Sequence, residues 1–230
     1  MAQKTYDEIK TKVDTLSEQR GKPTQLIAVS KTKPKEAVEH LYTTYNHRVF
    51  GENYIQELHE KATDLLEKCP EIEWHFIGRM QSNKLKLLLS TPNLKCVQTV
   101  HSVEIAQKME KILEKENKVL DVMIQINSSE EEQKNGINAE DAIEVIDEVN
   151  KLPHLHFIGI MTIGMVGDAR TNFTLMKELA EKIKNHYQLE KLEISMGMSA
   201  DFDIAIELGA TMVRVGTALF GARDYSKKHE

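Results

Sequence analysis

One lysine of this sequence, Lys31, directly follows a short apolar segment, Leu26–Ser30, that has the composition of a buried β-strand. An amine held at a stiff strand end can condense with an aldehyde, because burial and nearby positive charge lower the pKa of a lysine and free its lone pair. From position alone a solvated lysine is the favoured interpretation, since Lys33 and Lys35 follow closely. Lys31 is therefore a candidate Schiff-base lysine that needs support from elsewhere in the chain.

Two segments near the end of the sequence have residues that suit a phosphate. Ser199 follows an apolar stretch and precedes a predicted helix, where a hydroxyl and backbone amides bind anions, although a serine that only caps the helix fits the same pattern. Gly216 and Thr217 follow the last apolar stretch, and a glycine lets a ligand approach the backbone. Arg214 lies inside that stretch, where a guanidinium is costly unless it is paired.

Eight short apolar segments, rich in β-branched residues, are predicted to be the strands that position these residues. They are Leu26–Ser30, Val49–Glu52, Trp74–Gly78, Cys96–Val100, Val122–Asn127, Phe157–Thr162, Leu192–Met196 and Met212–Gly216. Several are nearly continuous in hydrophobicity, as parallel strands covered on both faces require, and segments with helical spacing lie between them. This alternation predicts a single closed (β/α)8 barrel of the TIM type, with an open doubly wound sheet as the alternative.

The barrel fold brings the candidate residues together. In such barrels the catalytic and ligand-binding residues lie at the carboxyl ends of the strands, and the loops after strands seven and eight usually bind phosphate. Ser199, Gly216 and Thr217 are therefore predicted to converge on one dianion, at the same end as Lys31. A phosphorylated ligand that also carries a carbonyl group fits this combination.

An additional helix is predicted before the first strand. Apolar residues recur at helical spacing from Tyr6 to Leu16, and Thr5 and Glu8 have the spacing of a capping box. We expect this helix to cover one end of the barrel.

The composition excludes several classes of function. A net charge of −6 argues against nucleic-acid binding, which demands clustered Lys and Arg, and no apolar run approaches bilayer length. Two distant cysteines suit a reducing compartment, which predicts a cytoplasmic protein. His154 and His156 have no third ligand at a metal spacing, so no metal site is expected. No linker divides the chain, and residues 1–230 are predicted to form one domain.

Several motifs, spread from about Leu26 to Tyr225, resemble those of a known family. They are Ala28-Val29-Ser30-Lys31-Thr32-Lys33-Pro34, Phe50-Gly51-Glu52-Asn53-Tyr54, His75-Phe76-Ile77-Gly78, Gln81-Ser82-Asn83-Lys84, and the segments 195–201 and 212–225. Together they are similar to the pyridoxal phosphate homeostasis proteins, which are related in fold to the N-terminal barrel of alanine racemase. The resemblance implies pyridoxal 5′-phosphate (PLP) as cofactor.

The resemblance also implies a role for individual residues. The cofactor site that it implies consists of Lys31, Asn53, Met198, Ser199, Arg214, Gly216 and Thr217. Lys31 would form the internal aldimine and Arg214 would approach the pyridine nitrogen, while the residues after the last two strands hold the phosphate. Asn53 and Met198 would line the wall. The resemblance implies no catalytic residue beyond this set.

Two further positions concern the loops. The family usually has Gly-Pro-Leu where this chain has Gly78-Arg79-Met80, and the loss of the proline predicts a more mobile loop after the third strand. Lys134 lies where the family tends to keep a lysine, and we expect it to contact incoming or departing cofactor.

The implied site favours a carrier over a fast enzyme. An arginine beside the pyridine nitrogen keeps that nitrogen unprotonated and weakens carbanion stabilisation. Racemisation also needs a proton donor on each face of the substrate, and alanine racemase takes one from a C-terminal domain that this sequence lacks. We therefore expect a protein, monomeric or weakly dimeric, that stores or buffers PLP or delivers it to apo-PLP enzymes. A PLP-dependent amino-acid racemase of low activity and a Schiff-base aldolase without PLP are the alternatives.

Overall fold

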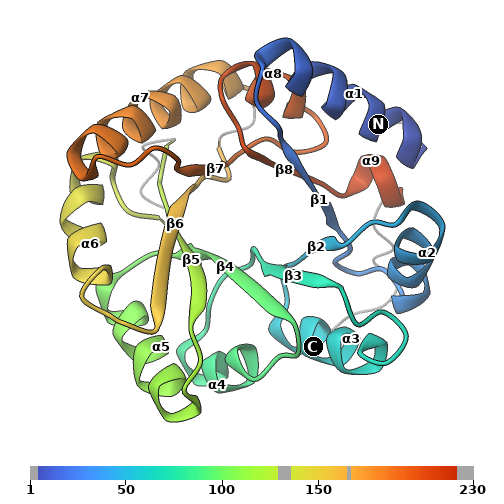
Figure 1. Cartoon of the computed structure of the whole chain (residues 1–230), viewed down its shortest axis with the longest axis horizontal. Coiled ribbons are helices and arrows are strands. Elements are labelled where there is room, and N and C mark those ends of the chain that lie inside the picture. The colour runs from blue at the N-terminus through green and yellow to red at the C-terminus, as the bar shows by residue number, and fades with distance from the viewer. Residues whose placement is uncertain (1–4, 129–135, 165–166, 222–230) are drawn as a thin grey trace.

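Eight parallel strands close into a barrel (Figure 1). The computed structural model describes residues 5–128, 136–164 and 167–221. The strands are β1 (Gln25–Val29), β2 (Val49–Glu52), β3 (Glu73–Phe76), β4 (Leu94–Val100), β5 (Leu120–Gln125), β6 (Leu155–Met161), β7 (Glu193–Ser195) and β8 (Met212–Val215). Each strand pairs with its sequence neighbours, and β1 pairs with β8. The predicted (β/α)8 barrel is confirmed, and the open sheet is wrong.

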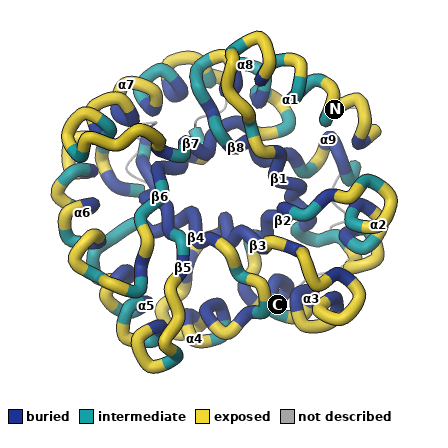
Figure 2. Tube along the Cα trace, in the orientation of Figure 1, coloured by how far each residue is buried: buried dark blue, intermediate teal, exposed yellow. Residues whose placement is uncertain are grey.

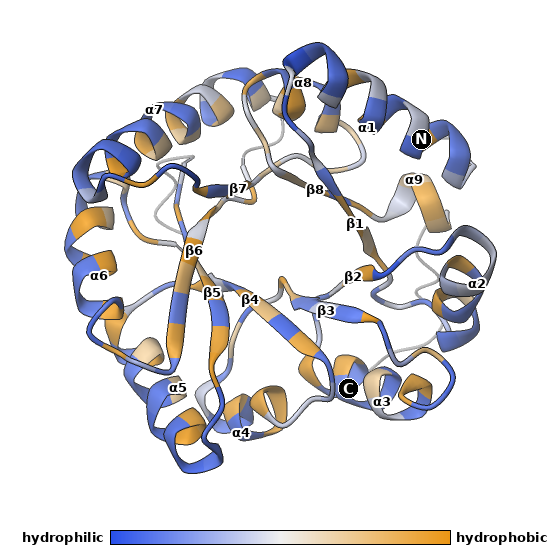
Figure 3. Ribbon diagram, in the orientation of Figure 1, coloured by the Kyte–Doolittle hydropathy of each residue, from blue (hydrophilic) through white to orange (hydrophobic). Residues whose placement is uncertain are grey.

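Helices surround the barrel and connect its strands. They are α1 (Tyr6–Arg20), α2 (Lys35–Tyr45), α3 (Ile55–Leu65), α4 (Leu85–Leu89), α5 (Val103–Glu116), α6 (Ala142–Val149), α7 (Ala169–Tyr187), α8 (Phe202–Glu207) and α9 (Thr217–Phe220), with 3-10 turns η1 (Ser82–Lys84) and η2 (Ala139–Asp141). The strands are largely buried and the outer turns of the helices are exposed (Figure 2). Hydrophobic and hydrophilic residues alternate around the helices, as expected of amphipathic helices on a sheet (Figure 3).

Helix α1 forms where the sequence predicts it. The Thr5 hydroxyl accepts a hydrogen bond from the Glu8 amide, and the Glu8 carboxylate accepts one from the Thr5 amide, so the capping box is confirmed. Its placement differs from the expectation: α1 packs against α8 and α9 in the outer ring and does not cover one end of the barrel (Figure 1). Ile9 and Val13 are both 0% exposed, so the apolar face of α1 must be covered along its length, and the neighbouring helices cover it.

The inside of the barrel is partly polar. Ile27, Met123 and Met161 belong to an apolar cluster separate from the larger core between strands and helices. Polar side chains on other strands are buried as well; they are His75, Gln98, Ser195 and Arg214. Buried polar groups require hydrogen-bond partners, so these residues must satisfy one another or bind a ligand.

The loop after β3 depends on a glycine. A Cβ atom at Gly78 would lie 1.8 Å from the carbonyl oxygen of Asn53, which is far too close for any side chain. Met80, in the same loop, is only 5% exposed. The expected mobility of this loop stays a prediction, but the backbone of Asn53 and that of Gly78 are packed together.

We expect Gly78→Ala to lower the free energy of unfolding by about 3 kcal/mol, because the added methyl group must displace backbone atoms. Chemical denaturation of the variant measures this change. Gly21→Ala is the matched control: Gly21 has a φ of 73° and no atom within 4 Å of its added Cβ, so only the left-handed backbone is strained, by about 1 kcal/mol. Equal losses in the two variants would contradict the packing argument.

Candidate functional site

A cavity of about 360 Å3 lies at the carboxyl ends of the strands. Its lining includes the seven residues predicted from the sequence: Lys31, Asn53, Met198, Ser199, Arg214, Gly216 and Thr217. The other lining residues are Val29, Lys33, Ile77, Met161, Ile163, Ala200, Phe220 and Gly221. The structure therefore brings the predicted residues to one place, although they lie on four different strand ends. Their individual roles stay predictions.

Lys31 is fixed at the cavity by contacts on both sides of it in the chain. The hydroxyl of Ser30 donates to Glu52 Oε1 at 2.7 Å, and the backbone amide of Thr32 donates to Glu57 Oε1 at 2.6 Å. Thr32 has a φ of 61°, in the left-handed region. Two buried carboxylates thus hold the residues on either side of Lys31, and one of these residues, Thr32, has a strained backbone conformation.

Lys61 joins these two carboxylates. Its ammonium donates to Glu52 Oε1 at 2.8 Å, to Glu57 Oε1 at 2.7 Å and to the backbone carbonyl of Ser30 at 2.8 Å. Lys61 and Glu57 are 7% and 9% exposed, and Glu52 is fully buried. We call Glu52, Glu57 and Lys61 the clamp cluster. The sequence analysis missed it, because Glu57 and Lys61 are four residues apart on one helix, a spacing typical of exposed ion pairs.

The clamp cluster holds two carboxylates and one cation. Burial raises the pKa of Glu52, the charge of Lys61 opposes this shift and the charge of Glu57 adds to it, and together they bring the pKa to about 7. Glu52 is therefore disposed to keep a proton near neutral pH. A like-charged pair in a low-dielectric site behaves this way because both groups cannot ionise without more than one cation.

Arg214 is buried, and among the residues that the structure describes no carboxylate forms a hydrogen bond or ion pair with it. Its Nη1 donates to the hydroxyl of Ser195 and its Nη2 donates to the backbone carbonyl of Thr162, both at 2.8 Å. Burial lowers the pKa of Arg214 to about 10, and the charge of Asp201 opposes the shift. The guanidinium therefore stays charged at neutral pH, and neutral oxygens satisfy it. Its positive charge can act on a ligand in the cavity.

Ser199 joins the loops after β7 and β8. Its Oγ accepts hydrogen bonds from the backbone amides of Gly216, at 3.3 Å, and Ala218, at 3.2 Å. The residue that precedes α8 is Asp201, so the interpretation of Ser199 as a plain helix cap is wrong. Hydroxyl and backbone amide donors from two loops meet at this point, and these are the groups that proteins use to bind phosphate.

Asn53 provides a polar atom that no described residue satisfies. Its side-chain Oδ1 is buried and has no hydrogen-bond partner among the residues that the structure describes. Such an atom in a ligand cavity is suited to a ligand donor. The cavity volume lies in the range of small-molecule sites. An amine, a phosphate-binding corner, a cation and an unsatisfied acceptor therefore fit the groups of PLP.

The remaining predicted positions lie elsewhere. His154 Nδ1 contacts Glu110 at 2.7 Å and His156 Nδ1 contacts Asp121 at 2.8 Å. Within residues 5–128, 136–164 and 167–221, no group of three His, Cys, Asp or Glu is placed to hold a metal ion. Among the helices in these ranges, none is long and apolar enough to cross a membrane. Lys134 falls outside the described residues.

Known proteins resemble this chain along most of its length. The family model "Alanine racemase, N-terminal domain" matches residues 5–224. A pyridoxal phosphate homeostasis protein of Homo sapiens is 44% identical over 216 residues, covering 89% of this chain and 78% of the relative. One from Pasteurella multocida is 42% identical over 210 residues, covering 88% of each chain.

Solved structures agree with these matches. PipY of Synechococcus elongatus with PLP bound has a TM-score of 0.78 and 29% identity, covering 91% of this chain and 100% of the other. Alanine racemase of Clostridium difficile has a TM-score of 0.72 at 17% identity, covering 97% of this chain and 58% of the other. The second likeness is one of fold alone.

Proposed function

The chain belongs to the pyridoxal phosphate homeostasis protein family, and we propose that it stores or buffers PLP, or delivers it to apo-PLP enzymes, through a reversible covalent bond to Lys31. The observation that carries the proposal is the meeting of Lys31, Arg214 and Ser199 at one cavity. The alternative of a Schiff-base aldolase without PLP finds no support in the relatives, which are named for PLP homeostasis.

Lys31 supplies the bond to the cofactor. When bound, PLP supplies a reactive aldehyde and a phosphate dianion. Lys31 would hold the cofactor through its amine, which would condense with the aldehyde with loss of one water, and the return of that water would release the cofactor again. The half-buried position of Lys31, with Ser30 and Thr32 held by the clamp cluster, keeps the amine at the cavity.

The opposite side of the cavity orients the cofactor. The backbone amides and hydroxyls at Ser199, Gly216 and Thr217 would hold the phosphate, and Asn53 and Met198 line the wall of the cavity. Arg214 stays a cation at neutral pH; beside the pyridine nitrogen of bound PLP it would disfavour protonation of that nitrogen and so weaken the electron sink that carbanion chemistry needs. This arrangement suits storage and release better than rapid turnover, and it leaves a racemase of low activity as the second candidate.

We also propose a cellular location and an oligomeric state for the protein. Cys69 and Cys96 are both free, buried thiols, which supports a cytoplasmic location. We propose that residues 1–230 form one PLP-binding domain and that the protein is a monomer or a weak homodimer, with apo-PLP enzymes as recipients of the cofactor.

Chemical trapping tests the proposal. The purified protein is mixed with PLP, reduced with borohydride and digested, and mass spectrometry locates the modified residue. We expect the reduced adduct on Lys31; absence of any adduct there would overturn the proposal. Transfer of PLP to an apo-PLP enzyme, compared with release into buffer, separates delivery from buffering, and steady turnover of a pure amino acid would favour the racemase.

A further inference from the structure

Four buried side chains form a hydrogen-bonded chain through the barrel. Arg214 Nη1 donates to Ser195 Oγ at 2.8 Å, and the Ser195 hydroxyl donates to Gln98 Oε1 at 2.6 Å. Gln98 Nε2 then lies 2.8 Å from His75 Nδ1. The four residues come from β8, β7, β4 and β3, and none is more than 3% exposed. We call them the relay residues.

The chemistry of the amide fixes the hydrogen on the last ring. Gln98 Nε2 can only donate, so His75 Nδ1 accepts and the ring carries its proton on Nε2. Burial lowers the pKa of His75 to about 4; Asp121 raises this pKa and Lys95 lowers it. His75 is therefore neutral at physiological pH, and it can act as a hydrogen-bond acceptor towards Gln98.

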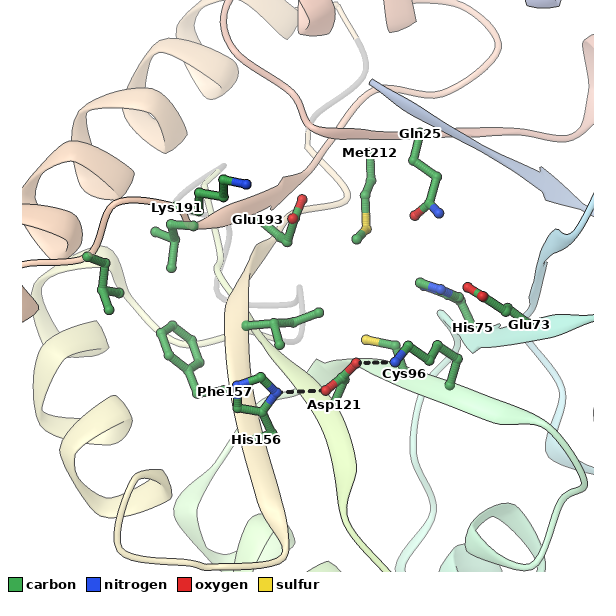
Figure 4. Close-up of a pocket in the computed structure, with 14 residues that line it drawn as sticks. Gln25, Glu73, His75, Cys96, Asp121, His156, Phe157, Lys191, Glu193 and Met212 are labelled. Carbon is green, nitrogen blue, oxygen red and sulfur yellow. Dashed lines mark hydrogen bonds and ion pairs between the residues drawn. The ribbon is translucent and has the colours of Figure 1, made fainter. Parts of the chain in front are cut away.

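The chain ends at a second cavity, of about 420 Å3, at the amino-terminal end of the barrel (Figure 4). The His75 ring lines this cavity. Beside it Asp121 binds Lys95 at 3.0 Å and His156 at 2.8 Å. The relay residues thus extend from the cofactor cavity, which Arg214 lines, to the opposite cavity, while Ser195 and Gln98 line neither of the two.

We propose that Ser195, Gln98 and His75 are positioning residues, which orient Arg214 towards the pyridine nitrogen of the cofactor; this inference rests on the proposed PLP site. An isolated hydroxyl can rotate, and its hydrogen can then face the guanidinium. Gln98 Oε1 takes that hydrogen, so a lone pair of Ser195 faces Arg214. His75 Nδ1 in turn accepts from the Gln98 amide in this orientation; a flipped amide would need a hydrogen on Nδ1 and would take the acceptor Oε1 away from the Ser195 hydroxyl.

Neutral partners serve this role better than a carboxylate does. A carboxylate would hold the guanidinium more tightly but would cancel the charge that the cofactor is to experience. Aligned neutral dipoles satisfy the buried cation and leave its charge in place. The relay residues therefore account for a buried arginine whose side-chain partner is a serine.

The test compares variants along the chain for PLP affinity and for the absorption spectrum of bound PLP. Ser195→Ala is expected to weaken PLP binding about tenfold, because a buried charged donor loses its acceptor. His75→Leu is expected to weaken it about threefold, although His75 lies outside the cofactor cavity, and His75→Gln, which keeps an acceptor, restores most of the affinity. His156→Gln is the control, since His156 lines the same far cavity but contacts Asp121 instead of the chain.

Nitrogen NMR of the cofactor-free protein supplies a second measurement that needs no variant. We expect the His75 ring to carry its hydrogen on Nε2; a hydrogen on Nδ1 would overturn the chain as described. If the wild-type protein binds PLP and Ser195→Ala and His75→Leu bind it equally well with unchanged spectra, the positioning role is wrong while the proposed function stands. If the wild-type protein forms no adduct at Lys31, the proposed function fails, and the positioning role fails with it.

Discussion

Lys31→Ala is expected to abolish the covalent adduct with PLP and to leave the fold intact. Alanine has no side-chain amine. Lys31 is half-buried and lines the cavity, so its truncation removes the nucleophile without leaving a void in the core. The variant should stay colourless in excess PLP and yield no borohydride-trapped peptide. Thermal unfolding of the cofactor-free variant should match that of the wild-type protein.

Two neighbouring lysines make the comparison specific. Lys33 also lines the cavity, and it is the amine that could replace Lys31. Lys35 forms an exposed ion pair with Asp64 at 2.7 Å and does not line the cavity. We expect Lys33→Ala to keep the adduct with reduced affinity and Lys35→Ala to match the wild-type protein. Full trapping of PLP on Lys33 in the Lys31→Ala variant would refute the assignment of the nucleophile.

The fold was predictable because a parallel barrel repeats one pattern. Each strand of the barrel lies near one of the eight predicted apolar segments, and disagreements concern the ends: β7 is Glu193–Ser195 where Leu192–Met196 was predicted. Apolar runs mark burial, whereas strand ends depend on backbone pairing that the runs do not encode. The predicted position of α1 was wrong for a related reason. Helical spacing identifies the buried face of a helix but not the element that covers it.

The cavity lining was predictable for a topological reason. Once a closed parallel barrel is assumed, all strand carboxyl ends meet at one edge, so Lys31, Ser199 and Gly216 must be neighbours. The supporting residues were not predictable in this way. Ser195 and Gln98 are 97 residues apart in sequence and Gln98 and His75 are 23 apart, and no spacing rule links such pairs. Their contacts depend on side-chain direction inside the barrel.

The clamp cluster leads to the largest stability effect that we expect. Lys61→Met keeps most of the side-chain volume but leaves Glu52 and Glu57 buried without their cation, which should lower the free energy of unfolding by about 3 to 5 kcal/mol at neutral pH. Lys35→Met is the matched control, because its ion pair with Asp64 is similarly short but about half-exposed. Its loss of stability should be much smaller, because solvent screens this exposed pair.

The loss of unfolding free energy caused by Lys61→Met should also depend on pH, in a direction that the pKa of Glu52 determines. The pKa of Glu52 in the folded protein, about 7, lies above its ordinary value of 4.5, so the folded state binds a proton that the unfolded state releases in this interval. Stability from this group is present below about pH 4.5 and is lost as the pH rises through about 7. Without Lys61 the pKa of Glu52 rises further, so the variant keeps this proton above about pH 7, where the wild-type protein has released it. The destabilisation should therefore be nearly constant below about pH 6 and grow as the pH rises above about 7, when denaturation is measured across both ranges. A destabilisation that is constant with pH would show that Lys61 acts through packing alone. If the Lys61→Met variant traps PLP on Lys31 at an unchanged rate, the clamp cluster does not hold Lys31 in place.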